Sequence, residues 1–208
     1  MSQRKGYTGV LSAAFLQGVF REVRQEILDA EQSVSFVLDE ELRLRYCNPA
    51  WDRFAEHNGA PYLSGEKVLG RFVLASTSVD LAAFYGTLYT DVLRDGRSRS
   101  HNFQCSSPDM QRLMRMNVLS LKTAGAVLVS CSIRVEQPHS DPSSEPVEER
   151  YRGAKGLIVM CSNCRKTRRA DVRPEVWDWV PQFVVRQPSM VSHGICNLCL
   201  GYYYPTGI

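Results

Sequence analysis

The 208-residue sequence lacks any long hydrophobic run. No stretch approaches the roughly 18 consecutive apolar residues that a membrane-spanning helix needs. The basic N-terminus, Met1 to Gly6, is followed by no unbroken apolar segment with a small-residue cleavage site, so a secretory signal is not expected. With 44% hydrophobic and 23% charged residues, the composition is typical of a soluble globular protein. We therefore expect a cytoplasmic protein that makes no membrane contact.

The sequence also lacks the common motifs of catalysis. It contains no Walker phosphate-binding loop, no Gly-x-Ser-x-Gly turn, no His-Glu-x-x-His motif and no kinase phosphoacceptor motif. His57, His101 and His139 have no acidic or cysteine partner at a meaningful spacing, so they are expected to be ordinary surface or core histidines. The sequence thus predicts a protein that is not an enzyme.

Charge is unevenly distributed around a small net value of +3. From residue 151 onward, eight basic residues oppose three acidic ones, a net of +5, whereas the first 150 residues carry a net of −2. A neutral body with a basic C-terminal region favours an anionic partner for that region.

An amphipathic helix is predicted over residues 9–30. Its apolar residues recur every four positions and form one stripe: Leu11, Phe15, Val19, Val23 and Ile27. Such a helix either packs on its own domain or forms a dimer contact.

The next hundred residues predict an antiparallel sheet interrupted by helices. Strands are expected over 33–38, 42–46, 100–105, 112–121 and 125–135, with one helix starting at Asn48-Pro49 and another over 78–94. Two groups of strands separated by a helical segment predict an α+β fold with helices covering one face of the sheet.

This region resembles a PAS sensor domain over about residues 30–135. The resemblance is carried by the element order and by the segments Phe36–Asp39, Tyr46–Asn48, Trp51–Ala55, Val68–Gly70 and Phe103–Asp109. It implies a five-stranded antiparallel sheet that holds a small ligand or cofactor beneath its helices, and dimerisation through the N-terminal helix. The identity of the PAS ligand is left open.

Four regions follow from these patterns. Residues 1–30 form the N-terminal helix, 31–136 the PAS-like domain, 137–156 a linker rich in proline and polar residues, and 157–208 a cysteine module.

The cysteines carry the strongest chemical signal. Cys47, Cys105 and Cys131 occur singly and are expected to be small core residues. The other four form two Cys-x-x-Cys pairs, Cys161/Cys164 and Cys196/Cys199, separated by 31 residues. Two such pairs can complete a tetrahedral zinc site, and a module of about fifty residues is too small to fold on a hydrophobic core alone. The sequence therefore predicts zinc bound by these four thiolates in a reducing compartment.

Other readings of the four cysteines remain open. An iron–sulfur cluster would use the same ligands, and a thiol redox switch would use the same pairs. No βαβ pattern supports a thioredoxin-like role, and Arg165 and Leu200 stand where c-type haem attachment requires histidine. His193 is the remaining candidate, either as a replacement ligand or as a hydrogen-bond donor behind the ligands.

The cysteine module is also similar to one that follows sensor domains in bacterial PAS-containing signalling proteins. The likeness lies in Ile158–Lys166, Trp177–Pro181, His193–Cys199 and Tyr204-Pro205. It implies a module that lies downstream of a sensor domain and uses the four cysteines as metal ligands, and it names neither a signal nor an output. The prediction is therefore a non-catalytic sensory or regulatory protein whose zinc-stabilised module relays a change to a protein partner. The alternative is a nucleic-acid-binding regulator that uses the basic residues Arg165, Lys166, Arg168 and Arg169.

Overall fold

The computed structural model describes residues 7–8, 13–75, 77–139 and 142–204. The chain divides into two compact units. The first comprises residues up to 77, 85–102 and 114–133; the second comprises 78–84, 103–113 and the chain from 134 onward. Among the described residues, no helix is both long enough and apolar enough to cross a membrane.

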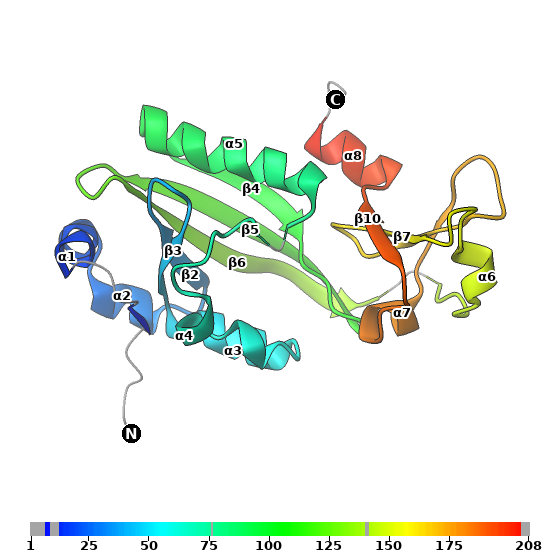
Figure 1. Cartoon of the computed structure of the whole chain (residues 1–208). Coiled ribbons are helices and arrows are strands. Elements are labelled where there is room, and N and C mark those ends of the chain that lie inside the picture. The colour runs from blue at the N-terminus through cyan, green and yellow to red at the C-terminus, as the bar shows by residue number, and fades with distance from the viewer. Residues whose placement is uncertain (1–6, 9–12, 76, 140–141, 205–208) are drawn as a thin grey trace. The chain divides into compact units, whose positions relative to one another are not determined.

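A mixed α+β arrangement is built on an antiparallel sheet (Figure 1). The five main strands lie in the order β3-β2-β6-β5-β4. Their bounds are Val34–Leu38 (β2), Leu44–Cys47 (β3), Arg99–Gln104 (β4), Met110–Leu121 (β5) and Ala126–Pro138 (β6). A two-residue strand, β1 (Tyr7–Thr8), pairs with the outer edge of β3. The predicted α+β fold with a five-stranded antiparallel sheet is confirmed.

One face of the sheet is covered by helices that follow β3 in the chain. These are α3 (Pro49–His57), the short η1 (Pro61–Leu63) and α4 (Gly65–Val68), and α5 (Val79–Asp95). Phe36 of β2 meets Trp51 of α3 edge to face at 5.4 Å, and the Tyr89 hydroxyl of α5 lies 3.6 Å from the Met116 sulfur. These contacts place the helices on the face that carries Phe36 and Met116.

Asn48 fixes the start of α3, as the Asn-Pro pair predicted. Its Oδ1 accepts hydrogen bonds from the backbone N–H groups of Ser35 and Trp51. Its Nδ2 donates to the carbonyl oxygens of Leu28 and Ser33. The buried amide therefore caps the helix and ties it to β2.

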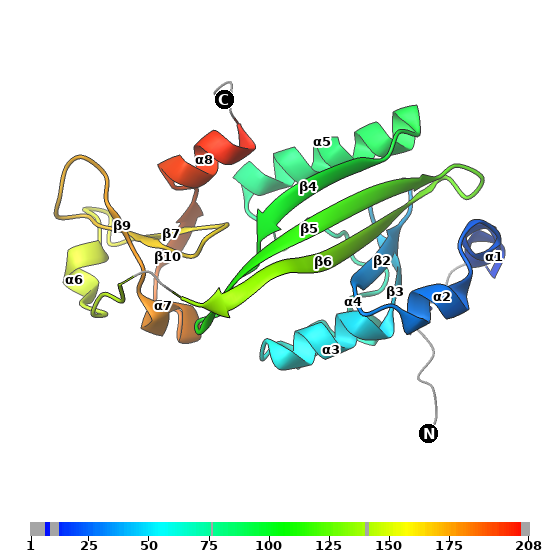
Figure 2. The same ribbon diagram turned by 180° about the vertical axis from the view of Figure 1, so that it is seen from behind.

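The opposite face is covered by two N-terminal helices, α1 (Ala13–Glu22) and α2 (Gln25–Ala30), which lie beside β2 and β3 (Figure 2). They pack on a cluster of buried residues: Val19, Leu28, Val37, Tyr46, Leu121, Ala126 and Leu128. Since Phe36 and Val37 are consecutive in a strand, they point to opposite faces, and the sheet is covered on both.

The prediction of one continuous helix over residues 9–30 is wrong; residues 9–12 lie outside the described part. The chain is extended at Arg24, with φ −65° and ψ 126°. Val19 and Leu28 are nine positions apart, about two and a half helical turns, so an unbroken helix would place them on opposite sides. The break lets both reach the same cluster, and it leaves Ile27 45% exposed.

The second unit contains a small mixed sheet of order β10-β7-β8-β9. Its elements are α6 (Glu148–Tyr151), β7 (Ile158–Cys161), β8 (Thr167–Arg168), β9 (Trp177–Asp178), α7 (Pro181–Val185), β10 (Val191–Gly194) and α8 (Asn197–Tyr203). The buried cluster beside this sheet consists of Tyr151, Ile158, Met160, Val180 and Phe183.

The segment 137–156, which the sequence marked as a linker, takes part in this unit. The Tyr151 hydroxyl donates to Asp178 Oδ2 at 2.9 Å, and the ring is almost fully buried. The backbone N–H of Ser144 donates to the Trp179 carbonyl at 2.8 Å, and the His139 ring stacks on Trp179 with centroids 3.9 Å apart.

Candidate metal centre

The first cysteine pair lies in a tight turn at the end of β7. Cys161 is the last residue of the strand, and its carbonyl accepts a hydrogen bond from the Arg165 N–H at 3.0 Å. The Cys161 N–H in turn donates to the Lys166 carbonyl at 2.8 Å. Arg165 has φ 65°, a left-handed conformation that reverses the chain. The turn therefore holds the Cys161 and Cys164 side chains together.

The second pair lies at the start of α8. Cys196 immediately precedes the helix and Cys199 belongs to its first turn, and the Leu200 N–H donates to the Cys196 carbonyl at 2.7 Å. Residues three apart in a helical turn lie on the same side. Both sulfurs of this pair therefore point in one direction.

Parallel pairing of β7 and β10 brings the two pairs together. The register aligns Cys161 with Gly194, two residues before Cys196. Since parallel strands end at the same edge of a sheet, the turn after β7 and the segment after β10 meet there. A β-carbon at Gly194 would lie 3.3 Å from the Val159 side chain, so the close approach of the strands favours glycine.

The four sulfur atoms form one compact group. All lie within 4.8 Å of one another, and Cys164 Sγ is 3.7 Å from Cys196 Sγ. A tetrahedral centre with metal–sulfur bonds of about 2.3 Å has sulfur–sulfur edges of about 3.8 Å. Cys161, Cys196 and Cys199 are buried and Cys164 is half-buried, while none of the seven cysteines forms a disulfide. The donor set therefore fits a thiophilic metal ion.

Polar groups around the sulfurs match a negatively charged centre. Asn163 Nδ2 donates to Cys199 Sγ at 3.2 Å, and the Cys196 N–H donates to Cys161 Sγ at 3.4 Å. Trp177 packs against the cysteine cluster, and its Nε1 is buried with no hydrogen-bond partner. The two hydrogen bonds to sulfur stabilise thiolate charge, and the Trp177 ring lies against the cysteines without donating to them.

The thiols also perturb one another electrostatically. Hydrogen bonds from Cys164, Cys196 and Cys199 stabilise the Cys161 thiolate and lower the pKa of Cys161. The same Cys161 contact raises the pKa of Cys164. Without a metal, one thiolate held by neighbouring thiols is favoured over several adjacent negative charges.

His193 lies outside the compact group of four. It belongs to β10, its side chain is exposed, and the metal-competent cluster found among the described residues contains only the cysteines. Its role as a substitute ligand or as a donor behind the ligands stays a prediction.

The basic run between the two cysteine pairs is partly neutralised. Arg168 pairs with Glu175 at 3.0 Å, and Arg169 makes two hydrogen bonds to Asp171 at 2.8 and 2.9 Å. These guanidinium groups therefore have acidic partners within the module itself.

The three single cysteines do not belong to the metal-competent group. Cys47 and Cys131 are buried in the sheet, as predicted for small core residues, whereas Cys105 is half-buried. Burial raises the pKa of Cys47 and of Cys105, which favours the neutral thiol at both positions. His101 meets Tyr85 edge to face at 6.0 Å, and burial lowers its pKa to about 4.

Sequence reasoning missed Asn163 and Tyr203. The Tyr203 hydroxyl donates to Asn163 Oδ1 at 2.9 Å, so the tyrosine orients the amide that contacts Cys199. The only available signal was the position of Asn163 inside a Cys-x-x-Cys turn, because the Tyr203 contact depends on how α8 folds back.

Comparison with solved structures finds PAS domains. One similar structure is the photoactive yellow protein domain of the sensor histidine kinase Ppr from Rhodospirillum centenum. The alignment covers 55% of this chain and 97% of that domain's chain, with 15% sequence identity and a TM-score of 0.39. The PAS domain of nitrogen regulation protein NR(II) from Vibrio parahaemolyticus covers 52% and 94%, with 21% identity and a TM-score of 0.35. The PAS domain of the Cronobacter turicensis RpfR quorum-sensing receptor, in complex with BDSF, covers 50% and 96%, with 20% identity and a TM-score of 0.39. No family model and no curated protein matches the chain.

Proposed function

We propose that this chain is a non-catalytic signal-transduction protein in which a PAS-like sensor body is joined to a zinc-binding module. The body receives a small ligand, a redox change or a partner, and the module relays the change to another protein. The observation that carries the proposal is the convergence of four sulfur atoms from two separate Cys-x-x-Cys pairs at one edge of a small sheet.

The order of elements supports the sensor part of this proposal. Strands β2 and β3, then helices, then β4, β5 and β6 build a sheet of order β3-β2-β6-β5-β4. This is the five-stranded arrangement implied by the PAS resemblance of residues 30–135. The proposal specifies no ligand for the PAS-like sensor body, because the side-chain contacts in that body select no single chemical class of ligand.

The donor set supports zinc. Four thiolates in tetrahedral reach suit zinc or an iron–sulfur cluster, and zinc has no redox chemistry of its own. Cys161, Cys164, Cys196 and Cys199 would supply the ligands, and the metal would hold the turn after β7 to the start of α8. A structural role matches the closed, largely buried position of the sulfurs.

A protein partner is favoured over nucleic acid as the target of the module. Arg168 and Arg169 are two of the four basic residues that nucleic-acid binding would use, and they pair with Glu175 and Asp171, which lowers the net positive charge available to phosphate. We retain a cytoplasmic location as part of the proposal, in line with reduced cysteines.

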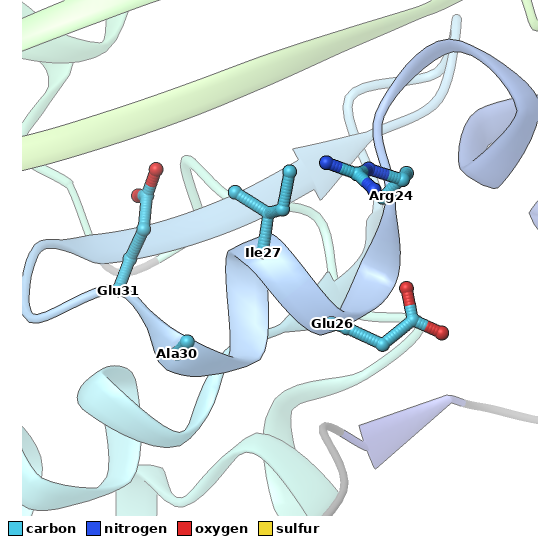
Figure 3. Close-up of a pocket in the computed structure, with 5 residues that line it drawn as sticks. All are labelled: Arg24, Glu26, Ile27, Ala30 and Glu31. Carbon is cyan, nitrogen blue, oxygen red and sulfur yellow. The ribbon is translucent and has the colours of Figure 1, made fainter.

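A homodimer through the N-terminal helices also belongs to the proposal. A surface hollow lies along α2, lined by Arg24, Glu26, Ile27, Ala30 and Glu31 (Figure 3). Ile27 and Glu31 rise from the same side of the helix, so an exposed apolar side chain stands next to a carboxylate. Light scattering of the full chain would give twice the chain mass.

Elemental analysis and an absorption spectrum of the purified full chain test the central assignment. We expect one zinc per chain and no visible bands from the metal, because zinc is colourless. The double variant C161S/C196S should lose the zinc, whereas the control C47S should keep it. Retention of zinc by the double variant, or a coloured centre with iron and sulfide, would overturn the assignment.

A further inference from the structure

The metal centre is linked to α5 by two side chains with no direct role in metal binding. Asn163 Nδ2 donates to Cys199 Sγ, and Asn163 Oδ1 accepts from the Tyr203 hydroxyl. The Tyr203 ring is 4% exposed and meets the Phe84 ring edge to face, with centroids 5.1 Å apart. Phe84 also meets Tyr204 edge to face at 6.3 Å. One continuous set of contacts therefore runs from a cysteine sulfur to the first two turns of α5.

Packing from outside the helix reaches the beginning of α5. Ser78 stands just before the helix, and among the described residues its Oγ is buried and makes no hydrogen bond, so Ser78 supplies no side-chain cap. A helix end that receives no cap from this residue gains more from tertiary packing. The Phe84–Tyr203 contact supplies packing at this end.

The far end of α5 is held differently. The helix is continuous from Val79 to Asp95, and Tyr89 and Val92 are buried in the core. Residues 78–84 belong to the second unit and 85–102 to the first. The first turns of α5 are therefore covalently continuous with the part of the helix that covers the sheet of the sensor body. A change in the order of these turns acts on that same helix.

We propose that Asn163 and Tyr203 are positioning residues through which the metal centre orders the first turns of α5. This inference rests on the proposed metal site. When the metal is bound, Cys199 is fixed, Asn163 is oriented by its sulfur contact, and Tyr203 is held against Phe84. When the metal leaves, Asn163 loses its fixed acceptor, and the start of α5 loses the partner that packs against it.

Amide hydrogen exchange on the full chain, zinc-loaded and then zinc-stripped with a chelator, tests this inference. In the natural chain, zinc removal should raise exchange at the amides of residues 82–85 by about fivefold or more, the lower range of coupling between linked sites. Exchange at residues 92–95 of the same helix serves as the internal reference and should change far less.

Two variants separate positioning from general unfolding. Y203F keeps the ring but removes the hydroxyl by which Asn163 holds it against Phe84. The zinc-loaded variant should therefore already exchange faster at residues 82–85, and zinc removal should add less than about twofold. N163A should behave in the same way. The control Y202F removes the neighbouring, more exposed hydroxyl and should respond as the natural chain does.

Zinc content is measured on every sample. If the natural chain binds no metal, the proposed function fails, and this inference fails with it. If zinc binds at one per chain but Y203F and N163A show the same loaded-to-stripped difference as Y202F, only this inference is overturned. A cobalt-substituted sample adds an independent readout: losing the amide contact to Cys199 should shift the sulfur-to-cobalt absorption in N163A and Y203F but not in Y202F.

Discussion

The two units of the chain hold their interiors together by different means. In the first unit, helices pack on both faces of a sheet, and large apolar side chains such as Val19, Leu28 and Tyr46 fill the space between. In the second unit, a buried cluster of five residues lies beside a separate group of cysteines. A small apolar core gives little hydrophobic stabilisation to oppose the conformational entropy of the chain. We therefore expect the first unit to fold without metal and the second unit to depend on metal for folding.

Metal removal should give the largest difference between the units. With excess chelator, we expect amides of β7, β10 and α8 to lose protection from hydrogen exchange, since metal-binding free energy is folding free energy in such modules. Amides of β2, β3 and β5 in residues 114–121 should stay protected. Equal protection of both units after complete metal loss would show that the contrast between them is wrong.

A core substitution in the first unit should give the opposite pattern. Leu28 is 2% exposed, so L28A should lower the free energy of unfolding by about 2–5 kcal/mol without changing the zinc content. The adjacent I27A is a matched control, because Ile27 is 45% exposed and should cost less than about 1 kcal/mol. Urea unfolding of both variants measures the difference. Similar losses from the two substitutions would contradict the broken-helix packing of α1 and α2.

A smaller effect is expected from the tryptophan beside the sulfurs. W177F changes the ring that packs against the cysteines, and groups that surround metal ligands typically contribute about tenfold in metal affinity. Competition with a chromophoric chelator should therefore show zinc held about tenfold more weakly. The control W179F changes a tryptophan that stacks on His139 and should leave zinc affinity close to that of the natural chain. If the two variants bind zinc equally well, Trp177 does not support the centre.

The smallest effect concerns His101 in the first unit. Burial lowers its pKa to about 4, below the ordinary value near 6.5, so the folded protein holds the ring neutral. Above about pH 6.5 the ring is neutral in both the folded and the unfolded chain, and the free energy of unfolding keeps its full value. As the pH falls toward 4, the unfolded chain takes up the proton first, and the free energy of unfolding decreases. An NMR titration of the ring should give a midpoint near 4. A midpoint near 6.5 would show that the ring is solvated.

Local patterns in the sequence predicted much of the fold. Alternating residues in 112–121 and the Asn48-Pro49 helix start depend on neighbours in the chain, and both appear as expected. The break at Arg24 was not predicted, because apolar periodicity cannot show that Val19 and Leu28 share one tertiary cluster. The four cysteines were identified from their spacing alone. The parallel β7–β10 pairing that unites them, and the Asn163–Tyr203 contact behind them, depend on segments some thirty to forty residues apart.

X-ray absorption at the zinc edge on the purified full chain measures the atoms bound to the metal. We expect a single shell of four sulfur atoms at about 2.3 Å, as four thiolates around one zinc ion require. A shell containing nitrogen or oxygen neighbours in place of two or more sulfurs would contradict it, as would a folded chain that contains no metal.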